Sequence, residues 1–132
     1  LKARSGRKVD FEFNTPEITE SVQVPLNVPL YEWVIENLIR NAIDAMAGAG
    51  KICLTVRDKG KQVQIDLQDS GKGIKSTQWK TVFNPGFTTK KRGWGLGLSL
   101  ARRIIVDYHG GRIFIVRSEK DKGTTFRIVL NK

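Results

Sequence analysis

The sequence predicts an α+β fold, a two-layer α/β sandwich in which a mixed, mostly antiparallel sheet is covered on one face by about three helices. Segments with apolar residues at every second position, typical of strands, alternate with segments whose apolar residues recur every three to four positions, typical of helices. Polar turns that contain glycine join neighbouring strand segments, as in hairpins. The 132 residues, 39% of them hydrophobic, suffice for one core. We therefore expect residues 1–132 to form a single domain.

The first part of the chain predicts two strands and a long helix. Residues 9–13 and 21–26 are typical of strands on either side of the turn-prone sequence NTPE. A helix is expected from Leu30 to Met46, and the sequence GAG at residues 48–50 ends it. Its apolar residues have the spacing of an amphipathic helix, and they are Leu30, Val34, Ile35, Leu38, Ile39, Ala42, Ile43 and Met46.

A predicted hairpin follows this helix. Residues 51–57 and 62–69 are expected to be strands joined by the turn sequence DKGK. Alternate residues of a strand share one face, so the apolar row of the second strand leads directly to Asp69. The row consists of Val63, Ile65 and Leu67.

Two helices and two strands complete the predicted fold. We expect a short helix near residues 76–83 and a longer one from about Leu96 to Tyr108, where two glycines stop it. Residues 111–116 and 124–130 are typical of strands, separated by the polar turn sequence SEKDKG.

The net charge limits the classes of partner without choosing among them. A charge of +10 suits nucleic acid, an anionic membrane or a small polyanionic ligand such as a nucleotide. The basic residues are scattered, without the interleaved aromatic residues of surfaces that bind single strands. Most of these charges are therefore expected on a solvated surface.

Composition also limits the cellular setting. No stretch approaches the roughly 20 apolar residues that cross a bilayer, and the first residues, LKARSGRK, lack the apolar run of a signal peptide. The single cysteine, Cys53, allows no internal disulfide. We expect a cytoplasmic protein, or the cytoplasmic part of a membrane-anchored protein. A start at Leu1 rather than methionine suggests a piece of a longer chain.

Two asparagines interrupt the apolar pattern of the long helix. Asn37 and Asn41 lie four residues apart and so share a face, with Asp44 three residues further on. An amide oxygen can join phosphate oxygens and waters around Mg²⁺, a metal that proteins hold with few side chains of their own. The alternative is that both asparagines only hydrogen-bond to neighbouring loops.

The sequence DSGKGI, residues 69–74, follows the second hairpin strand. Asp69 could accept a hydrogen bond from the exocyclic amine of adenine, while Gly71 and Gly73 would let the backbone approach the base. Guanine carries an acceptor at that position, so a buried carboxylate would select against it. The alternative is an ordinary β-turn, in which Asp and Gly are common.

The sequence GWGLGLSLARRI, residues 93–104, places three alternating glycines directly before a predicted helix. Backbone N–H groups there could converge on a phosphate, which the positive end of the helix dipole also favours. It is not a Walker A loop, because no GK[ST] follows. Upstream, Phe83 and Phe87 bracket NPG and would anchor a loop whose cations, Lys90 among them, approach the phosphate. The alternative is a basic surface loop.

Together these segments resemble the ATP-binding domain of sensor histidine kinases. ENLIRNAIDAM resembles the N box, DSGKGI the first glycine box, VFNPGF the F box, GWGLGLSLAR the second glycine box and GTTFRIVL the closing strand. That family shares the Bergerat ATP-binding fold with gyrase, Hsp90 and MutL. The resemblance covers roughly residues 9–131, in the family's order and with family-like spacing.

The resemblance implies ATP and Mg²⁺ as cofactors and gives a role to each matching position. Asn41 would bind Mg²⁺ with the help of Asn37, and Asp69 would accept the adenine amine. Thr124 would support the adenine site through its hydroxyl. The implied ATP-binding residues are Asn37, Asn41, Asp69, Gly71, Gly73, Lys90, Gly95, Leu96, Gly97, Leu98 and Thr124.

Two positions depart from the patterns of related proteins. Gyrase-like ATPases carry a water-activating glutamate where this chain has Asn37, which implies little hydrolysis and a γ-phosphate reserved for another acceptor. The adjacent Glu36 points about 100° away on the helix and is interpreted as a surface acid. Ala45 stands where many of these kinases have an aromatic residue on adenine, so the stacking partner is not assigned. No catalytic residue is assigned either.

The one histidine of the sequence, His109 in DYHGG, lies at a predicted helix end and is interpreted as a capping or surface residue. The resemblance therefore implies a separate helical phosphoacceptor domain of the same kinase, a dimer in the full-length protein, and a response regulator downstream. No contact with nucleic acid or membrane is expected. Two alternatives stay open: a stand-alone Bergerat-fold ATPase or serine kinase, and a basic nucleic-acid-binding module.

Overall fold

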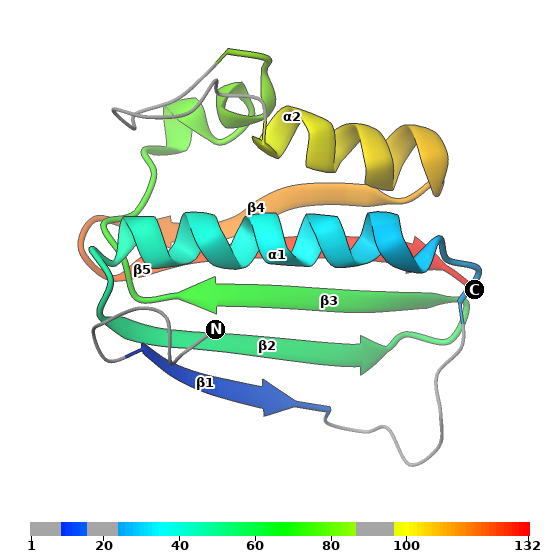
Figure 1. Cartoon of the computed structure of the whole chain (residues 1–132), viewed down its shortest axis with the longest axis horizontal. Helices are drawn as coiled ribbons and strands as arrows, with labels where there is room; N and C mark the ends of the chain where they lie inside the picture. The colour runs from blue at the N-terminus through cyan, green and yellow to red at the C-terminus, as the bar shows by residue number, and fades with distance from the viewer. Residues whose placement is uncertain (1–8, 16–23, 87–96) are drawn as a thin grey trace.

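A five-stranded sheet forms one layer of the molecule (Figure 1). The computed structural model describes residues 9–15, 24–86 and 97–132. The strands lie in the order β1-β2-β3-β5-β4, with β1 parallel to β2 and every other neighbouring pair antiparallel. The mixed, mostly antiparallel sheet of the predicted fold class is therefore confirmed. The strands are β1 (Val9–Asn14), β2 (Gly50–Asp58), β3 (Gln62–Asp69), β4 (Arg112–Glu119) and β5 (Gly123–Asn131).

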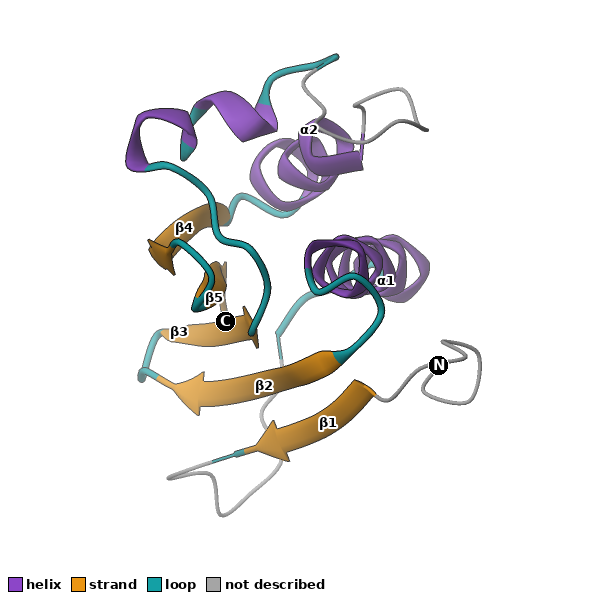
Figure 2. Ribbon diagram, turned by 90° about the vertical axis from the view of Figure 1, so that its left-hand side faces the viewer, coloured by secondary structure: helices purple, strands orange, loops and turns teal. Residues whose placement is uncertain are grey.

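Helices form the second layer, on one face of the sheet (Figure 2). The longest is α1 (Val28–Ala45), and α2 (Gly97–Arg102) continues without interruption into the π-helical segment η4 (Arg103–Tyr108). Two single 3₁₀ turns, η2 (Ser76–Gln78) and η3 (Thr81–Phe83), lie between β3 and α2 in the chain. This arrangement confirms the two-layer sandwich.

Local chemistry defines both ends of α1. The side chain of Asn27 caps the helix by accepting a hydrogen bond from the backbone N–H of Leu30 at 3.1 Å, and Pro29 fits the first turn. The helix therefore begins two residues before the predicted start. At the other end, Ala47 and Gly48 have φ values of 54° and 84°, a left-handed conformation that stops the helix.

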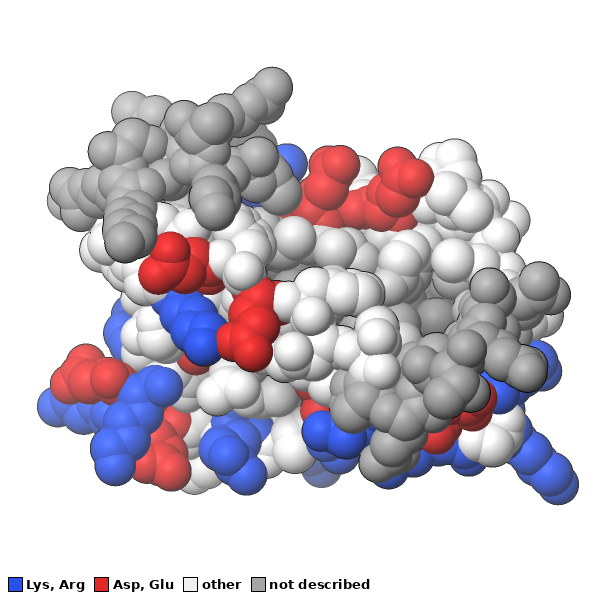
Figure 3. All heavy atoms as spheres, turned by 90° about the horizontal axis from the view of Figure 1, so that it is seen from below, with Lys and Arg blue, Asp and Glu red and all other residues white. Residues whose placement is uncertain are grey.

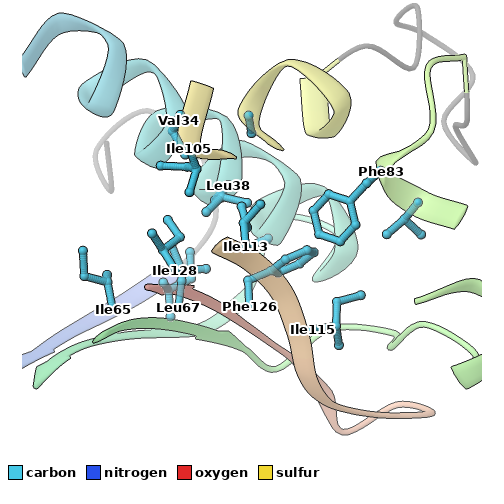
Figure 4. Close-up of a cluster of buried hydrophobic side chains, with 14 of the residues drawn as sticks. Val34, Leu38, Ile65, Leu67, Phe83, Ile105, Ile113, Ile115, Phe126 and Ile128 are labelled. Atoms are coloured by element: carbon cyan, nitrogen blue, oxygen red, sulfur yellow. The ribbon is translucent and has the colours of Figure 1, made fainter. Parts of the chain in front are cut away.

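The core lies between the two layers (Figure 4). Val34 and Leu38 of α1 and Ile105 of η4 are fully or almost fully buried against the inner face of the sheet. Phe83 packs edge-on against Phe126 of β5, with ring centroids 6.0 Å apart. Phe83 therefore belongs to the core. Its role as an anchor for the loop that follows stays a prediction, because Phe87 and the rest of that loop lie outside the described residues.

Three predicted elements differ from the structure. Residues 24–26 of the strand expected at 21–26 are not in a strand, and the rest of it lies outside the described residues. The helix expected at 76–83 is instead the two 3₁₀ turns, because this polar stretch lacks the apolar period of an α-helix. The second half of the helix expected at 96–108 is π-helical, where His109 N–H reaches back to the carbonyl of Ile104 at 3.1 Å.

Candidate nucleotide-binding site

Asp69 occupies the end of β3 as a buried carboxylate that is only 4% exposed. Its Oδ1 atom accepts hydrogen bonds from the backbone N–H groups of Gly71 at 2.8 Å and Thr124 at 3.3 Å. No described residue donates a hydrogen bond to the other oxygen, Oδ2. The carboxylate is thus fixed in orientation through one oxygen, and the second remains an acceptor for a ligand donor.

Burial determines the protonation behaviour of Asp69. Loss of hydration raises the pKa of the carboxyl group above its ordinary value, and the two backbone N–H donors reduce this increase without cancelling it. A donor placed against Oδ2, such as an exocyclic amine, would stabilise the charged form and lower the pKa again. Ligand binding and ionisation of Asp69 are therefore coupled.

The loop after Asp69 is wedged between two parts of the protein. A Cβ atom on Gly71 would lie 2.7 Å from the backbone carbon and oxygen of Ala45, at the end of α1. Gly73, with φ of +83°, packs in the same way against the carbonyl of Glu119. The backbone of Lys72 hydrogen-bonds on both sides, to Ala45 and to Asp121. Both glycines are therefore required by protein contacts, a reason that the sequence pattern alone did not show.

Thr124 lies beside Asp69 on β5 and is 4% exposed. Its hydroxyl lies 2.8 Å from the hydroxyl of Ser118, its register partner on β4. The Ser118 hydroxyl also accepts a 2.6 Å hydrogen bond from the backbone N–H of Ile74. Ser118 was not singled out from the sequence, and only knowledge of the β4–β5 register could have indicated it.

Asn37 and Gly97 meet where α1 faces the start of α2. A Cβ atom on Gly97 would lie 2.7 Å from Oδ1 and 2.9 Å from Nδ2 of Asn37, so any side chain at this position would displace the amide. The Nδ2 atom of Asn37 is buried and has no hydrogen-bond partner among the described residues. A buried donor without a partner is costly, and a bound phosphate or another ligand oxygen would satisfy it. Leu98, the next residue, packs against the core.

One row of α1 connects the two halves of the site. Asn37, Asn41 and Ala45 are spaced four residues apart and so lie along one side of the helix. Asn37 contacts Gly97, while Ala45 contacts Gly71, roughly 12 Å further along the helix axis. Figure 1 shows that β3 and α1 end on the same side of the molecule. The structure therefore brings the amides, the carboxylate and the start of α2 to one region.

Some of the predicted site residues lie outside the described residues. These are Lys90, Gly95 and Leu96, and the cations around Lys90 belong to the same segment. Their proposed roles stay predictions. Glu36 is exposed on α1, in agreement with its interpretation as a surface acid.

His109 has a structural role at the end of η4. Its Nδ1 atom lies 2.9 Å from the carbonyl oxygen of Ile104, and its Nε2 atom accepts a 3.0 Å hydrogen bond from the backbone N–H of Asn27. An accepting Nε2 and a carbonyl beside Nδ1 together fix the neutral ring with its proton on Nδ1. The ring joins the end of η4 to the cap of α1, as the helix-end interpretation predicted.

Charges of both signs share the surface outside this region (Figure 3). Lys51 pairs with Glu12, and Lys132 pairs with Asp58. A shallow hollow of about 160 Å³ on the open face of the sheet contains the two-bond pair between Arg127 and Asp66. No helix in the described ranges is long and apolar enough to cross a membrane.

Comparison with known proteins identifies the family of this chain. Residues 28–132 match the family described as "Histidine kinase-, DNA gyrase B-, and HSP90-like ATPase". Sensor histidine kinase ZraS of Escherichia coli (strain K12) is 44% identical over 126 residues, 96% of this chain and 26% of that protein. Alginate biosynthesis sensor protein KinB of Pseudomonas aeruginosa is 42% identical over 101 residues, 75% of this chain and 17% of that protein. The solved nucleotide-free catalytic domain of histidine kinase ThkA has a TM-score of 0.82 at 36% identity, with 94% of this chain and 79% of that chain covered.

The chain therefore belongs to the histidine kinase-, DNA gyrase B- and HSP90-like ATPase family. Its matched relatives are sensor histidine kinases, and the domain is the catalytic ATPase domain of that class of two-component enzymes. It spans about a quarter of the length of ZraS.

Proposed function

We propose that this domain binds Mg²⁺-ATP and presents the γ-phosphate to a histidine on a separate helical domain of the same kinase. The observation that carries the proposal is the row Asn37, Asn41 and Ala45, which runs from the start of α2 to the loop after Asp69. Its length of roughly 12 Å suits a ligand with a base at one end and phosphates at the other. Residues 1–132 would form this single catalytic domain.

The Ala45 end of the row, which lies near the carboxylate of Asp69, would hold adenine. The Oδ2 atom of Asp69 would accept the exocyclic amine, and the loop wedged at Gly71 and Gly73 would form one wall of the base pocket. Guanine would place an oxygen against the carboxylate, and the desolvated charge would be left without a donor. We therefore assign selection for adenine to Asp69.

The amide end of the row would hold the phosphates and the metal ion. The side chains at this end fit Mg²⁺ and phosphate. Amide oxygens are suitable ligands for Mg²⁺, and the buried Nδ2 of Asn37 lacks a hydrogen-bond acceptor among the described residues, which a phosphate oxygen would supply. Asn41 would ligate the metal, with Asn37 assisting. When bound, Mg²⁺ neutralises the charge of the transferring phosphoryl group. The backbone from Gly95 to Leu98 would contact the phosphates, with Lys90 approaching them from outside.

The identity of Asn37 favours phosphoryl transfer over hydrolysis. Gyrase-like ATPases place a water-activating glutamate at this position, and an amide cannot accept the proton of an attacking water. Catalysis of phosphoryl transfer depends mainly on positioning the reactants and neutralising the charge of the phosphoryl group. The nucleophile can therefore come from the phosphoacceptor domain. We infer a cytoplasmic, dimeric parent kinase that serves a response regulator. A relative, ThkA, has been solved in complex with the response regulator TrrA, at a TM-score of 0.78 and 34% identity, with 94% of this chain and 34% of that chain covered.

Calorimetric titration tests the nucleotide site. We expect saturable binding of ATP that Mg²⁺ strengthens, and much weaker binding of GTP. Asp69→Asn should weaken ATP and reduce its advantage over GTP, whereas Asn41→Ala should weaken Mg²⁺-ATP more than metal-free ATP. Failure of the wild-type domain to bind ATP, together with salt-sensitive binding of single-stranded DNA, would replace the proposal with the nucleic-acid alternative.

A second experiment tests the transfer step. The domain is mixed with γ-labelled ATP and the purified histidine-bearing helical domain of a sensor histidine kinase. We expect an acid-labile label on that helical domain and little free phosphate from this domain alone. Rapid hydrolysis without an acceptor would instead favour a stand-alone ATPase.

A further inference from the structure

The hydroxyl of Ser118 lies at the junction of three segments around the proposed base pocket. It lies 2.6 Å from the N–H of Ile74, at the end of the glycine loop, and 2.8 Å from the hydroxyl of Thr124. Thr124 in turn donates its backbone N–H to Oδ1 of Asp69. Ser118 therefore contacts Thr124, one of the two hydrogen-bond partners of the carboxylate, and also the end of the glycine loop.

The bond between the two hydroxyls can run in either direction, because either oxygen can be the donor. The Ser118 oxygen accepts from the N–H of Ile74 and has a single hydrogen of its own to donate. Among the described residues, the Thr124 oxygen is the one acceptor within reach of that hydrogen. With Thr124 as the donor, its single hydroxyl hydrogen would point at Ser118 and none would be left for a ligand. An acceptor atom of a ligand beside Thr124 would therefore select the direction in which Ser118 donates to Thr124.

This direction leaves the hydroxyl hydrogen of Thr124 free to point elsewhere. Thr124 is 4% exposed and lies beside the Asp69 carboxylate. The adjacent edge of adenine carries an amine donor and, next to it, the acceptor N1. An acceptor carboxylate beside a donor hydroxyl matches this edge, directly or through one water, whereas guanine presents the reverse pattern.

We propose that Ser118 is a positioning residue that makes the Thr124 hydroxyl a hydrogen-bond donor toward N1 of adenine. This inference rests on the proposed function, since it requires adenine beside Asp69. It adds a second determinant of base selection, which acts through another side chain. The loop contacts at Gly73 and Lys72 hold Ile74 in place, so the Ser118 hydroxyl has few alternative orientations.

The test compares ATP with 1-deaza-ATP, in which a C–H group replaces N1. Wild-type domain should bind ATP more tightly by roughly 2- to 13-fold, the range for one net hydrogen bond. Ser118→Ala should reduce this ratio toward one, as should Thr124→Val, which lacks the hydroxyl. Ser118→Thr keeps the hydroxyl and should retain the wild-type ratio. Ser118→Cys, with a weak S–H donor, gives an intermediate ratio and replaces the alanine variant if that variant does not fold.

The ratio of the affinities for ATP and 1-deaza-ATP distinguishes a positioning role of Ser118 from a merely structural one. If Ser118 only supported the loop, its loss would weaken both nucleotides by the same factor and leave the ratio unchanged, which would overturn the inference. Equal binding of the two nucleotides by the wild-type domain would also overturn it. Either result, with ATP binding still dependent on Asp69, would leave the proposed function intact. Loss of that dependence would instead contradict the proposed function itself.

Discussion

Substitution of Gly97 by alanine tests whether α2 positions the amide of Asn37. The added Cβ would lie 2.7 Å from Oδ1, whereas ordinary contacts begin at 3.4 Å, so the amide must move by about 0.7 Å. A flexible side chain can make this movement, and alanine is favoured over glycine in helices by about 1 kcal/mol. We therefore expect the free energy of unfolding to stay within about 1 kcal/mol of wild type.

Nucleotide affinity should respond much more than stability to Gly97→Ala. A displaced amide loses its interaction with a charged phosphate or metal group, worth about 1.5–3 kcal/mol, which corresponds to a roughly 10- to 150-fold weaker Kd for Mg²⁺-ATP. Calorimetric titration measures the affinity, and thermal unfolding measures stability.

A matched glycine and a double variant complete this experiment. Gly60 lies in the β2–β3 turn with φ of +81°, and no atom lies within 4 Å of the position that an added Cβ would take. Gly60→Ala should therefore cost about 1–2 kcal/mol of stability through backbone strain while leaving the Kd unchanged. The Asn37→Ala, Gly97→Ala double variant should bind no more weakly than Asn37→Ala alone. Additive losses, or wild-type affinity in Gly97→Ala, would refute the positioning argument.

Five further outcomes follow from the structure. Because burial raises the pKa of Asp69 above 3.8, ATP affinity should fall as the pH drops through the raised value, a step that titrations of Asp69→Asn should lack. The stability of the free domain should change with pH in the opposite sense to the ATP affinity. The contribution of Asp69 to the free energy of unfolding is fully present below its unfolded-state pKa and is lost as the pH rises through its folded-state pKa. Urea unfolding at several pH values can measure this loss. Gly123→Ala should lower the urea midpoint by the equivalent of about 3 kcal/mol or more, since its Cβ would collide with the Asp69 carbonyl at φ of +109°. Asp66→Asn should cost about 1 kcal/mol in thermal unfolding, because its two-bond pair with Arg127 is partly exposed. His109→Phe should cost about 1–3 kcal/mol in urea unfolding, because the backbone N–H of Asn27 loses its acceptor and the carbonyl of Ile104 loses one of its two partners.

Helices and strands whose apolar residues recur at a regular spacing could be predicted from the sequence. The apolar spacing of α1 gave its existence and its buried face, and the alternation along β3 placed Asp69 at the end of an inward-facing row. These features depend on residues close together in the chain, which a pattern can reveal. The start of α1 required the cap at Asn27, a polar residue that the apolar pattern did not include.

Contacts between distant segments could not be predicted in the same way. The sequence suggested that Gly71 and Gly73 admit a ligand, but it could not show that Ala45 and Glu119 already occupy the space beside them. Ser118 carries no motif, and its position beside Thr124 depends on the register of β4 and β5. The parallel pairing of β1 with β2 likewise depends on packing across the whole domain.

That parallel pairing has a consequence for how the domain assembles. β1 contacts the sheet through β2 alone, and its partner residues, such as Val9 and Gly50, are separated in the chain by the whole of α1. The strands from β2 to β5 pair with one another only as antiparallel neighbours. Pairing β1 with β2 closes a longer loop than the β2–β3 and β4–β5 hairpins do, at a greater cost in chain entropy, so β1 should join the sheet after these hairpins have formed. Its amide protons should then exchange with solvent sooner than those of β3, which has a strand on each side.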